Sequence, residues 1–528
     1  MRKLSKRKKK WIERTVANDR SYKIVLYNRF FLFLLAVLWQ LVGYALLILA
    51  FAYDSTIGAT VQLVVGVLAI LFVLRIINRN ERPSSKLSWI ILILIFPVFG
   101  VPTYLFSGGG RPTRDMRKKI ARAKAENNKR LEKEDAINEE TRSRENAISR
   151  YLSVCGGYPV YKSGTIDYYK CGEEAFPEML AALEKAEKFI LVEYFIIAHG
   201  KMWNEILKRL VEKAMQGVRV RIIYDDFGCM VTLPPKYELY LESLHENIKC
   251  MTFNDVVPFF SVRMNNRDHR KMLVIDGKVA FTGGINLADE YINEKERFGY
   301  WKDSALKITG AAVNSFTEMF FYMWNAFRKD KEELREYILP QETEKETGIV
   351  IHPYDDSPLD NISVGESAYV DLINRASKSV WIFTPYLVLD DFLRASLCQA
   401  ALRGVDVRIV TPGIPDKKTV YRLTRANYAP LMKSGVKIYE YAPGFIHAKS
   451  MVCDGEAAIV GTINLDYRSL YHHFENAVYF SGCKAVDEVK RDCEETFAIS
   501  KLCTPENTKR GFFGKLIDSM LRVFETLL

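Results

Sequence analysis

The sequence predicts a mixed α/β protein in which two similar α/β/α sandwich halves follow a group of N-terminal transmembrane helices. Three observations lead to this prediction. Long apolar stretches lie between basic blocks near the start of the chain. From about residue 150 onward, strand-like and helix-like patterns alternate, as they do in layered α/β domains. The second part of this alternating region repeats the first, so we expect two halves of one kind, related by a pseudo-twofold axis.

The N-terminal region is typical of a membrane anchor at residues 30–106, preceded by a basic N-terminus at residues 1–29. Residues 30–51 and 57–77 are each long and apolar enough to cross a bilayer. Much of the net charge of +11 lies in basic blocks that flank these stretches. Such flanks favour anionic lipid headgroups over nucleic acid. We therefore expect a multi-pass protein of the cell membrane whose partners are membrane lipids.

A third apolar stretch, residues 87–106, contains Pro97, Gly100 and Pro102, so one straight helix is not expected there. Three segments next to the apolar stretches are basic: the N-terminus, the loop at residues 75–86 and the segment after residue 111. Basic segments of membrane proteins prefer the cytoplasmic side. Two spans plus a re-entrant or interfacial segment satisfy all of them and put the catalytic part in the cytoplasm. Residues 107–150 are rich in charge and predict a solvated linker.

The internal repeat divides the remainder into domains at residues 151–335 and 336–509. The apolar, β-rich run at residues 188–195 resembles the run at residues 379–386. In each half a helical pattern then ends in glycine and a second β-rich run begins, which is the expected stop of a helix and start of a strand. Each half is therefore predicted to be an α/β sandwich.

Each half ends with the same motif, His-x-Lys-x4-Asp-Gly, followed by a strand that closes in small residues and an asparagine. One such motif would be weak evidence, because a histidine on an apolar strand is usually a core residue. Two motifs in the same register of a repeat point to a site. The candidate catalytic residues are His269, Lys271, Asp276, His447, Lys449 and Asp454, and the candidate phosphate ligands are Asn286 and Asn464.

The chemistry of these groups suits a phosphodiester. A histidine and a lysine two positions apart on a strand project from the same face. A neutral histidine can attack phosphorus while a second one protonates the departing alkoxide. Lysine and asparagine side chains can bind the phosphoryl oxygens. No acidic cluster with metal-ligand spacing accompanies the motifs, so we expect no metal and no other cofactor, and the nine cysteines are expected to be free thiols.

With these motifs the sequence resembles the phospholipase D superfamily and, within it, the bacterial cardiolipin synthases. The resemblance covers nearly the whole chain and includes Thr384-Pro385-Tyr386 and the run GTINLDYRS at residues 461–469. It implies transfer of a phosphatidyl group from one phosphatidylglycerol to another, with release of glycerol, through a phosphohistidine and without a metal. It also implies that His269 is the nucleophile and His447 the acid and then the base. The residues alone do not order the two histidines.

Residue parity separates the acidic members of the motifs from their histidines. Asp276 and Asp454 lie at a turn, at odd spacing from the histidines, so we expect them mainly to shape the turn. Asp303 and Glu475 are better candidates to orient the histidine rings, and the resemblance also implies an acid at these two places. A carboxylate on the distal ring nitrogen selects the tautomer and stabilises the charged ring.

Several alternatives remain open at this stage. Within the same chemistry, the chain could be another phosphatidyltransferase or a phospholipase D hydrolase, and a nuclease is less consistent with the membrane spans. From another class, it could be a non-catalytic membrane scaffold. His472 and His473 resemble a weak metal pair, but adjacent residues of a strand point in different directions. Residues 510–528 predict an amphipathic C-terminal helix that packs on the core or lies on the membrane.

Overall fold

The computed structural model describes residues 38, 41–46, 48–49, 51–79, 82–107, 112–130, 147–255, 265–339, 348–360, 362–523 and 525. By their internal contacts the residues form two units. The N-terminal unit comprises Met1–Gly110, Val256–Met264 and Ser519–Leu528. The second unit, here called the α/β body, comprises Arg111–Asp255 and Asn265–Asp518.

One described helix, α3 (Ser55–Ile77), is long and apolar enough to cross a membrane. It begins where Asp54 accepts a hydrogen bond from the amide of Thr56 at 2.7 Å, an N-cap that satisfies a helix end otherwise without partners. Two spanning helices were expected, and the first of them, at residues 30–51, lies largely outside the described residues. The described part of the chain thus contains one such helix.

The third apolar stretch forms two helices, α4 (Pro83–Ile95) and α5 (Pro97–Ser107), which are interrupted at Phe96 as Pro97 predicts. The helices lie close together at Gly100, where an added Cβ would be 2.7 Å from the Cα of Ile93. Aromatic and aliphatic side chains of α3, α4 and α5 form a small shared core: Ala69, Ile76, Trp89, Leu92, Ile93 and Tyr104. The three helices therefore pack as one group.

The α/β body contains a seven-stranded and an eight-stranded sheet, and seven strands of the second, from β9 to β12, repeat the order of the first, while β17 is an additional edge strand. The first sheet runs β1-β8-β6-β5-β2-β3-β4 and the second β17-β12-β11-β10-β14-β15-β16-β9. The strands of the first sheet are β1 (Thr165–Tyr169), β2 (Phe189–Tyr194), β3 (Arg219–Asp225), β4 (Ile248–Phe253), β5 (Lys271–Ile275), β6 (Val279–Gly283) and β8 (Ala305–Thr309). The strands of the second sheet are β9 (Val350–Asp356), β10 (Ser379–Phe383), β11 (Asp406–Pro412), β12 (Lys437–Tyr441), β14 (Ser450–Cys453), β15 (Ala457–Gly461), β16 (Glu475–Ser481) and β17 (Ser500–Leu502).

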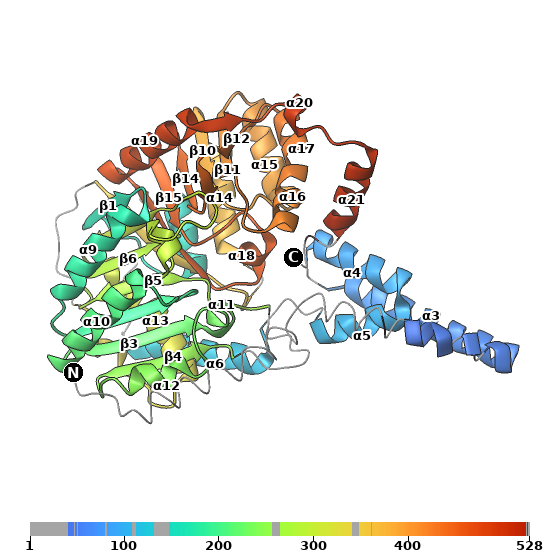
Figure 1. Ribbon diagram of the computed structural model, residues 1–528, viewed down its shortest axis with the longest axis horizontal. Helices are drawn as coiled ribbons and strands as arrows, with labels where there is room; N and C mark the ends of the chain where they lie inside the picture. Colours follow the sequence, from blue (N-terminus) through green and yellow to red (C-terminus); the bar gives the residue numbers. More distant parts are fainter. Residues whose placement is uncertain are drawn as a thin grey trace. The chain divides into compact units, whose positions relative to one another are not determined.

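In each sheet three neighbouring strands are parallel, β2–β3–β4 and β10–β11–β12, and the rest pair antiparallel. The internal repeat in the sequence therefore corresponds to two equivalent sheets, and the fold is the mixed α/β fold that was predicted. The longer helices that flank the sheets (Figure 1) are α9 (Gly172–Glu184), α10 (Lys201–Met215), α13 (Val313–Phe327), α14 (Val364–Arg375), α15 (Asp391–Leu402) and α19 (Lys484–Ala498). Shorter helices are α8 (Ala147–Tyr151), α11 (Asp226–Cys229), α12 (Tyr237–Glu242), α16 (Lys418–Ala426), α17 (Tyr428–Lys433), α18 (Tyr467–Tyr471) and α20 (Pro505–Thr508).

Both faces of the central strands are buried, which explains their continuous apolar sequences. In β2, Ile190 and Val192 face an outer core shared with α9 and α10, while Leu191 faces a central core. The central core contains residues of both sheets together with α13 and α19. A third core lies on the other face of the second sheet, against α14 and α15. Each sheet is thus enclosed by helical layers.

The charged segment expected to be a linker contains a helix, α6 (Arg114–Arg130), that belongs to the α/β body and packs against α13. Met116, Ile120 and Ala123 recur at helical spacing and are buried, and the first two belong to the central core. The prediction of a wholly solvated segment missed this stripe because charged residues outnumber the apolar ones. The helix α6 therefore contributes to the core of the α/β body.

Candidate active site

Backbone pairing between the two halves positions the two motif histidines. Ahead of β5, the amide of His269 donates to the carbonyl of Phe474 at 2.8 Å. Ahead of β14, the amide of His447 donates to the carbonyl of Lys302 at 2.7 Å, next to a parallel pair of short strands, β7 (Tyr300–Lys302) and β13 (Gly444–Ile446). These backbone bonds place His269 beside Glu475, the residue after Phe474. They place His447 beside Asp303, the residue after Lys302.

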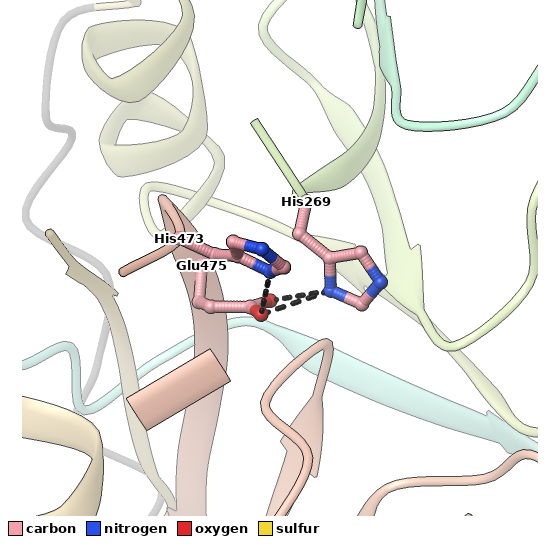
Figure 2. A group of neighbouring side chains, drawn as sticks. All are labelled: His269, His473 and Glu475. Atoms are coloured by element: carbon pink, nitrogen blue, oxygen red, sulfur yellow. Dashed lines mark hydrogen bonds and ion pairs between the residues drawn. The ribbon is translucent and has the colours of Figure 1, made fainter. Parts of the chain in front are cut away.

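Each histidine ring meets that carboxylate. His269 Nδ1 lies 2.9 Å from both carboxylate oxygens of Glu475, as Figure 2 shows. His447 Nδ1 lies 2.6 Å from Asp303 Oδ2. Both acids are fully buried, and both histidines are 7% exposed. Because Nδ1 is occupied in each ring, Nε2 is the nitrogen left for a substrate.

The two histidine–carboxylate pairs differ in the residue that lies against the carboxylate. The hydroxyl of Thr462 donates to Glu475. The equivalent position in the first half is Gly284, where an added Cβ would lie 1.9 Å from Asp303 Oδ1. Threonine thus donates to the longer acid, and glycine leaves room for the shorter one. This difference is a physical reason why the second motif has Thr462 where the first has Gly284.

The motif lysines lie in the same buried site. Lys271 Nζ donates to the carbonyl of His269 at 2.7 Å, and Lys449 Nζ donates to the carbonyl of His447. Both side chains are 1% exposed. Burial lowers the pKa of Lys271 to about 8, against the attraction of Glu475. Burial also lowers the pKa of Lys449 to about 7. An ammonium with one neutral acceptor keeps donors for an anion, so the lysines suit phosphate binding.

The histidines themselves favour the neutral form. Burial, reinforced by the charge of Lys271, lowers the pKa of His269 well below its usual value. Burial and the charge of Lys449 lower the pKa of His447 to about 4. Burial raises the pKa of Glu475, whereas Asp303, despite its burial, has a lowered pKa because His447 and Lys449 stabilise its charge. A neutral imidazole beside a carboxyl group can act as a nucleophile or a base.

The motif aspartates lie at the opposite ends of their strands. The carboxylate of Asp276 accepts hydrogen bonds from the amides of Glu187, Lys188 and Phe189 at 2.8, 2.7 and 2.8 Å. Asp454 accepts the equivalent bonds from residues 377–379. Seven residues of extended chain separate Asp276 from His269, which is roughly 20 Å. These aspartates therefore hold the starts of β2 and β10 and do not reach the histidines.

Both candidate asparagines are buried, and the fold uses part of the hydrogen-bonding capacity of Asn286. Asn286 Oδ1 accepts from the amide of Ile196 at 3.0 Å, and Nδ2 donates to the hydroxyl of Tyr291 at 2.7 Å. One Nδ2 proton of Asn286 is thus used within the fold and one remains. Asn464 is 5% exposed, and its Oδ1 has no hydrogen-bond partner among the described residues.

Aromatic rings that the sequence analysis did not single out surround the histidines. Phe195 meets His269 edge-on at 4.9 Å between ring centroids, and Tyr291 meets His447 at 5.5 Å. His473 also lies against His269, at 5.6 Å between centroids. Phe195 directly follows β2, but nothing in a single sequence shows which ring it meets.

Comparisons with known proteins agree in family. A family profile described as "Cardiolipin synthase, PLD-like domain" matches residues 179–324 and 369–497. A second one, described as "Phospholipase_D-nuclease N-terminal", matches residues 67–109.

The similar proteins align with most of the chain. A cardiolipin synthase of Alkalihalophilus pseudofirmus is 32% identical, over 88% of this chain and 94% of that protein. A cardiolipin synthase of Geobacillus kaustophilus is 32% identical, over 87% of this chain and 92% of that protein. An uncharacterized protein of Streptococcus mutans is 43% identical, over 86% and 99%. The crystal structure of phosphatidylserine synthase from Haemophilus influenzae shares the fold, with a TM-score of 0.55 and 15% identity over 72% of this chain and all of that one.

Proposed function

The chain belongs to the cardiolipin synthase family of phosphatidyltransferases, and we propose that it joins two phosphatidylglycerols into cardiolipin and glycerol through a phosphohistidine. The observation that carries the proposal is the pair of buried His–carboxylate contacts, His269 with Glu475 and His447 with Asp303, each beside a motif lysine. Two histidines in one site are what a two-step transfer needs, one to hold the phosphatidyl group and one to move protons.

In the first step Nε2 of His269 attacks the phosphorus of the first phosphatidylglycerol. The bond from phosphorus to the glycerol oxygen breaks. The bound anionic phosphodiester favours the protonated form of His447, whose Nε2 gives its proton to that oxygen, so glycerol leaves. Glu475 stabilises the positive charge that the His269 ring acquires. Lys271 and Lys449, with Asn464 and the remaining Nδ2 proton of Asn286, bind the phosphoryl oxygens in this proposal.

In the second step His447, now neutral, takes the proton of a glycerol hydroxyl on the second phosphatidylglycerol. That oxygen attacks phosphorus, the phosphorus–nitrogen bond to His269 breaks, and cardiolipin forms. His447 is protonated again and His269 is neutral, so the site returns to its first state without a net change in protons. None of these steps draws on a cofactor or a metal.

A substrate with an activated leaving group tests the order of the two histidines. A phosphatidyl ester of p-nitrophenol needs no acid for its departure, so the His447→Asn variant should react once and retain the labelled phosphatidyl group. Peptide mapping should find the label on His269, and the His269→Asn variant should bind none. Label on His447 in the single variant His269→Asn would reverse the assignment.

We also propose a multi-pass protein of the cell membrane, with two spans, a re-entrant or interfacial segment and a cytoplasmic α/β body. The apolar helix α3 and the interrupted pair α4 and α5 support this arrangement. The C-terminal helix α21 (Phe512–Val523) adds to it. Its large apolar side chains are exposed (Phe512, Phe513, Leu516, Ile517 and Met520). This exposure favours contact with a lipid surface over packing on the core.

The topology can be tested by labelling a cysteine at Ser107 with a membrane-impermeant reagent. Intact cells should leave Ser107→Cys unlabelled, and permeabilised cells should label it. Labelling in intact cells would place this segment outside and exclude the proposed topology.

A further inference from the structure

His473 brings a third ligand-type side chain to the pair formed by His269 and Glu475 (Figure 2). One nitrogen from each histidine and one oxygen of Glu475 all lie within 4.8 Å of one another. The closest approaches to Glu475 Oε1 are 2.9 Å from His269 Nδ1 and 3.8 Å from His473 Nδ1. The cluster joins one residue of the first half to two of the second.

The burial of His473 has no explanation within the protein alone. The residue is 9% exposed, yet neither ring nitrogen has a hydrogen-bond partner among the described residues. A buried imidazole normally has a partner on at least one nitrogen, because leaving a polar group unpaired costs about 1–3 kcal/mol. Its contact with Glu475 at 3.8 Å is too long to be a hydrogen bond. Within the described part of the chain, the ring nitrogens of His473 therefore have no hydrogen bond that would prevent them from binding a metal ion, and the ring lies beside the other two side chains.

We propose that His269, His473 and Glu475 form a binding site for a zinc-like transition-metal cation and that its occupation inhibits the enzyme. Two imidazoles and one carboxylate are a ligand set that zinc takes in proteins. At zinc–ligand distances of about 2.1 Å, tetrahedral ligands lie roughly 3.4 Å apart, so small rotations of the rings suffice. Magnesium and calcium prefer oxygen ligands and should bind poorly.

Inhibition follows from the atoms that the cation uses. Binding at His269 Nδ1 requires that nitrogen to give up its proton to solvent, and the cation then takes the carboxylate that otherwise accepts it. The lone pair of Nε2 loses electron density to the cation, so attack on phosphorus slows. The cation is therefore an inhibitor that competes with the proton on Nδ1, and the bound cation has no part in turnover. This inference goes beyond the proposed function, and cation binding can be measured without any turnover.

The test uses the full-length protein in detergent, titrated with Co²⁺ as a spectroscopic substitute for Zn²⁺. The variant is His473→Asn, and the matched control is His472→Asn, which changes the neighbouring histidine outside the cluster. The unchanged protein and the control should show the visible absorption of a tetrahedral Co²⁺ site, and His473→Asn should lose it. The difference between variants removes any contribution of the cysteines.

Turnover gives the second readout, with zinc held at buffered concentrations. Zn²⁺ should inhibit the unchanged protein, EDTA should restore activity and Mg²⁺ should have no such effect. His473→Asn should need at least ~10-fold more Zn²⁺ for half inhibition, since altered partners of a bound metal already cost 10–100-fold in affinity. Equal Co²⁺ spectra and equal Zn²⁺ sensitivity in the two histidine variants would overturn the proposal. If His473→Asn fails to fold, as judged by circular dichroism, His473→Gln takes its place under the same criteria.

Discussion

Burial raises the pKa of Glu475, but the positive ring of the phosphohistidine favours the charged form of this acid. Replacing Glu475 by glutamine therefore removes the charge that faces the ring and changes little in shape. In the unchanged protein both carboxylate oxygens lie 2.9 Å from His269 Nδ1, and Glu475 is fully buried. Opposite charges about 4 Å apart interact by about 4 kcal/mol at an effective dielectric constant of about 20. That energy stabilises the positive ring of the phosphohistidine and corresponds to about a thousandfold in rate. Because glutamine keeps one acceptor oxygen, we expect kcat to fall at least ~100-fold.

The assay measures release of glycerol from phosphatidylglycerol vesicles at neutral pH in the presence of EDTA. Glu456→Gln is the matched control, since Glu456 is exposed and pairs with Lys378 at 3.3 Å, in the turn after β14. The control should keep full activity. A Glu475→Gln variant that folds and also keeps full activity would refute the role of Glu475 as the partner of His269.

The remaining predictions concern pH, the turn aspartates and the glycine behind Asp303. Lys271 and Lys449, with pKa values lowered to about 8 and about 7, carry their charge below these values and lose it as the pH rises through them. Hence kcat/KM should fall above about pH 7. The fall of kcat should come at higher pH, because the bound anionic phosphodiester keeps the lysines charged. An alkaline limb of kcat/KM near the usual lysine pKa would contradict the effect of burial on these pKa values. Asp276→Ala should lower the free energy of unfolding by about 3 kcal/mol, measured by thermal unfolding, because three amides lose their acceptor, with kcat per folded molecule unchanged; a loss of kcat without a loss of stability would contradict the turn role. Gly284→Ala should reduce turnover at least ~100-fold, because the new Cβ would displace Asp303, and full activity would show that this contact is not needed.

Local features of the sequence were sufficient to predict much of the fold. Apolar β-rich runs and the glycines after helical patterns located β2, β3, β10 and β11, and the repeat corresponds to two sheets that share the order of seven strands. Strand parity also separated Asp276 from His269, and the structure places the aspartate at a turn with a φ of 54°. These predictions succeed because each depends on residues within one strand or its neighbours.

Contacts between the halves could not be predicted from a single sequence. The sequence predicts that Glu475 orients a motif histidine, but nothing in the run around Glu475 shows that this histidine is His269, 206 positions away in the other half. The metal pair considered for His472 and His473 was set aside because adjacent side chains diverge, yet His473 meets a histidine of the other half. The buried stripe of α6 was hidden for a related reason, since only its tertiary partner distinguishes three apolar residues from a charged surface helix.

The measurement that tests the central claim most directly is the lipid product of the purified full-length protein acting on phosphatidylglycerol vesicles in EDTA. The account predicts cardiolipin and glycerol in equal amounts, and no product from His269→Ala or His447→Ala. Phosphatidic acid without cardiolipin would make the protein a hydrolase. If the folded, unchanged protein forms no product, phosphatidyl transfer between phosphatidylglycerols is contradicted. That result would favour the alternative of a non-catalytic membrane scaffold.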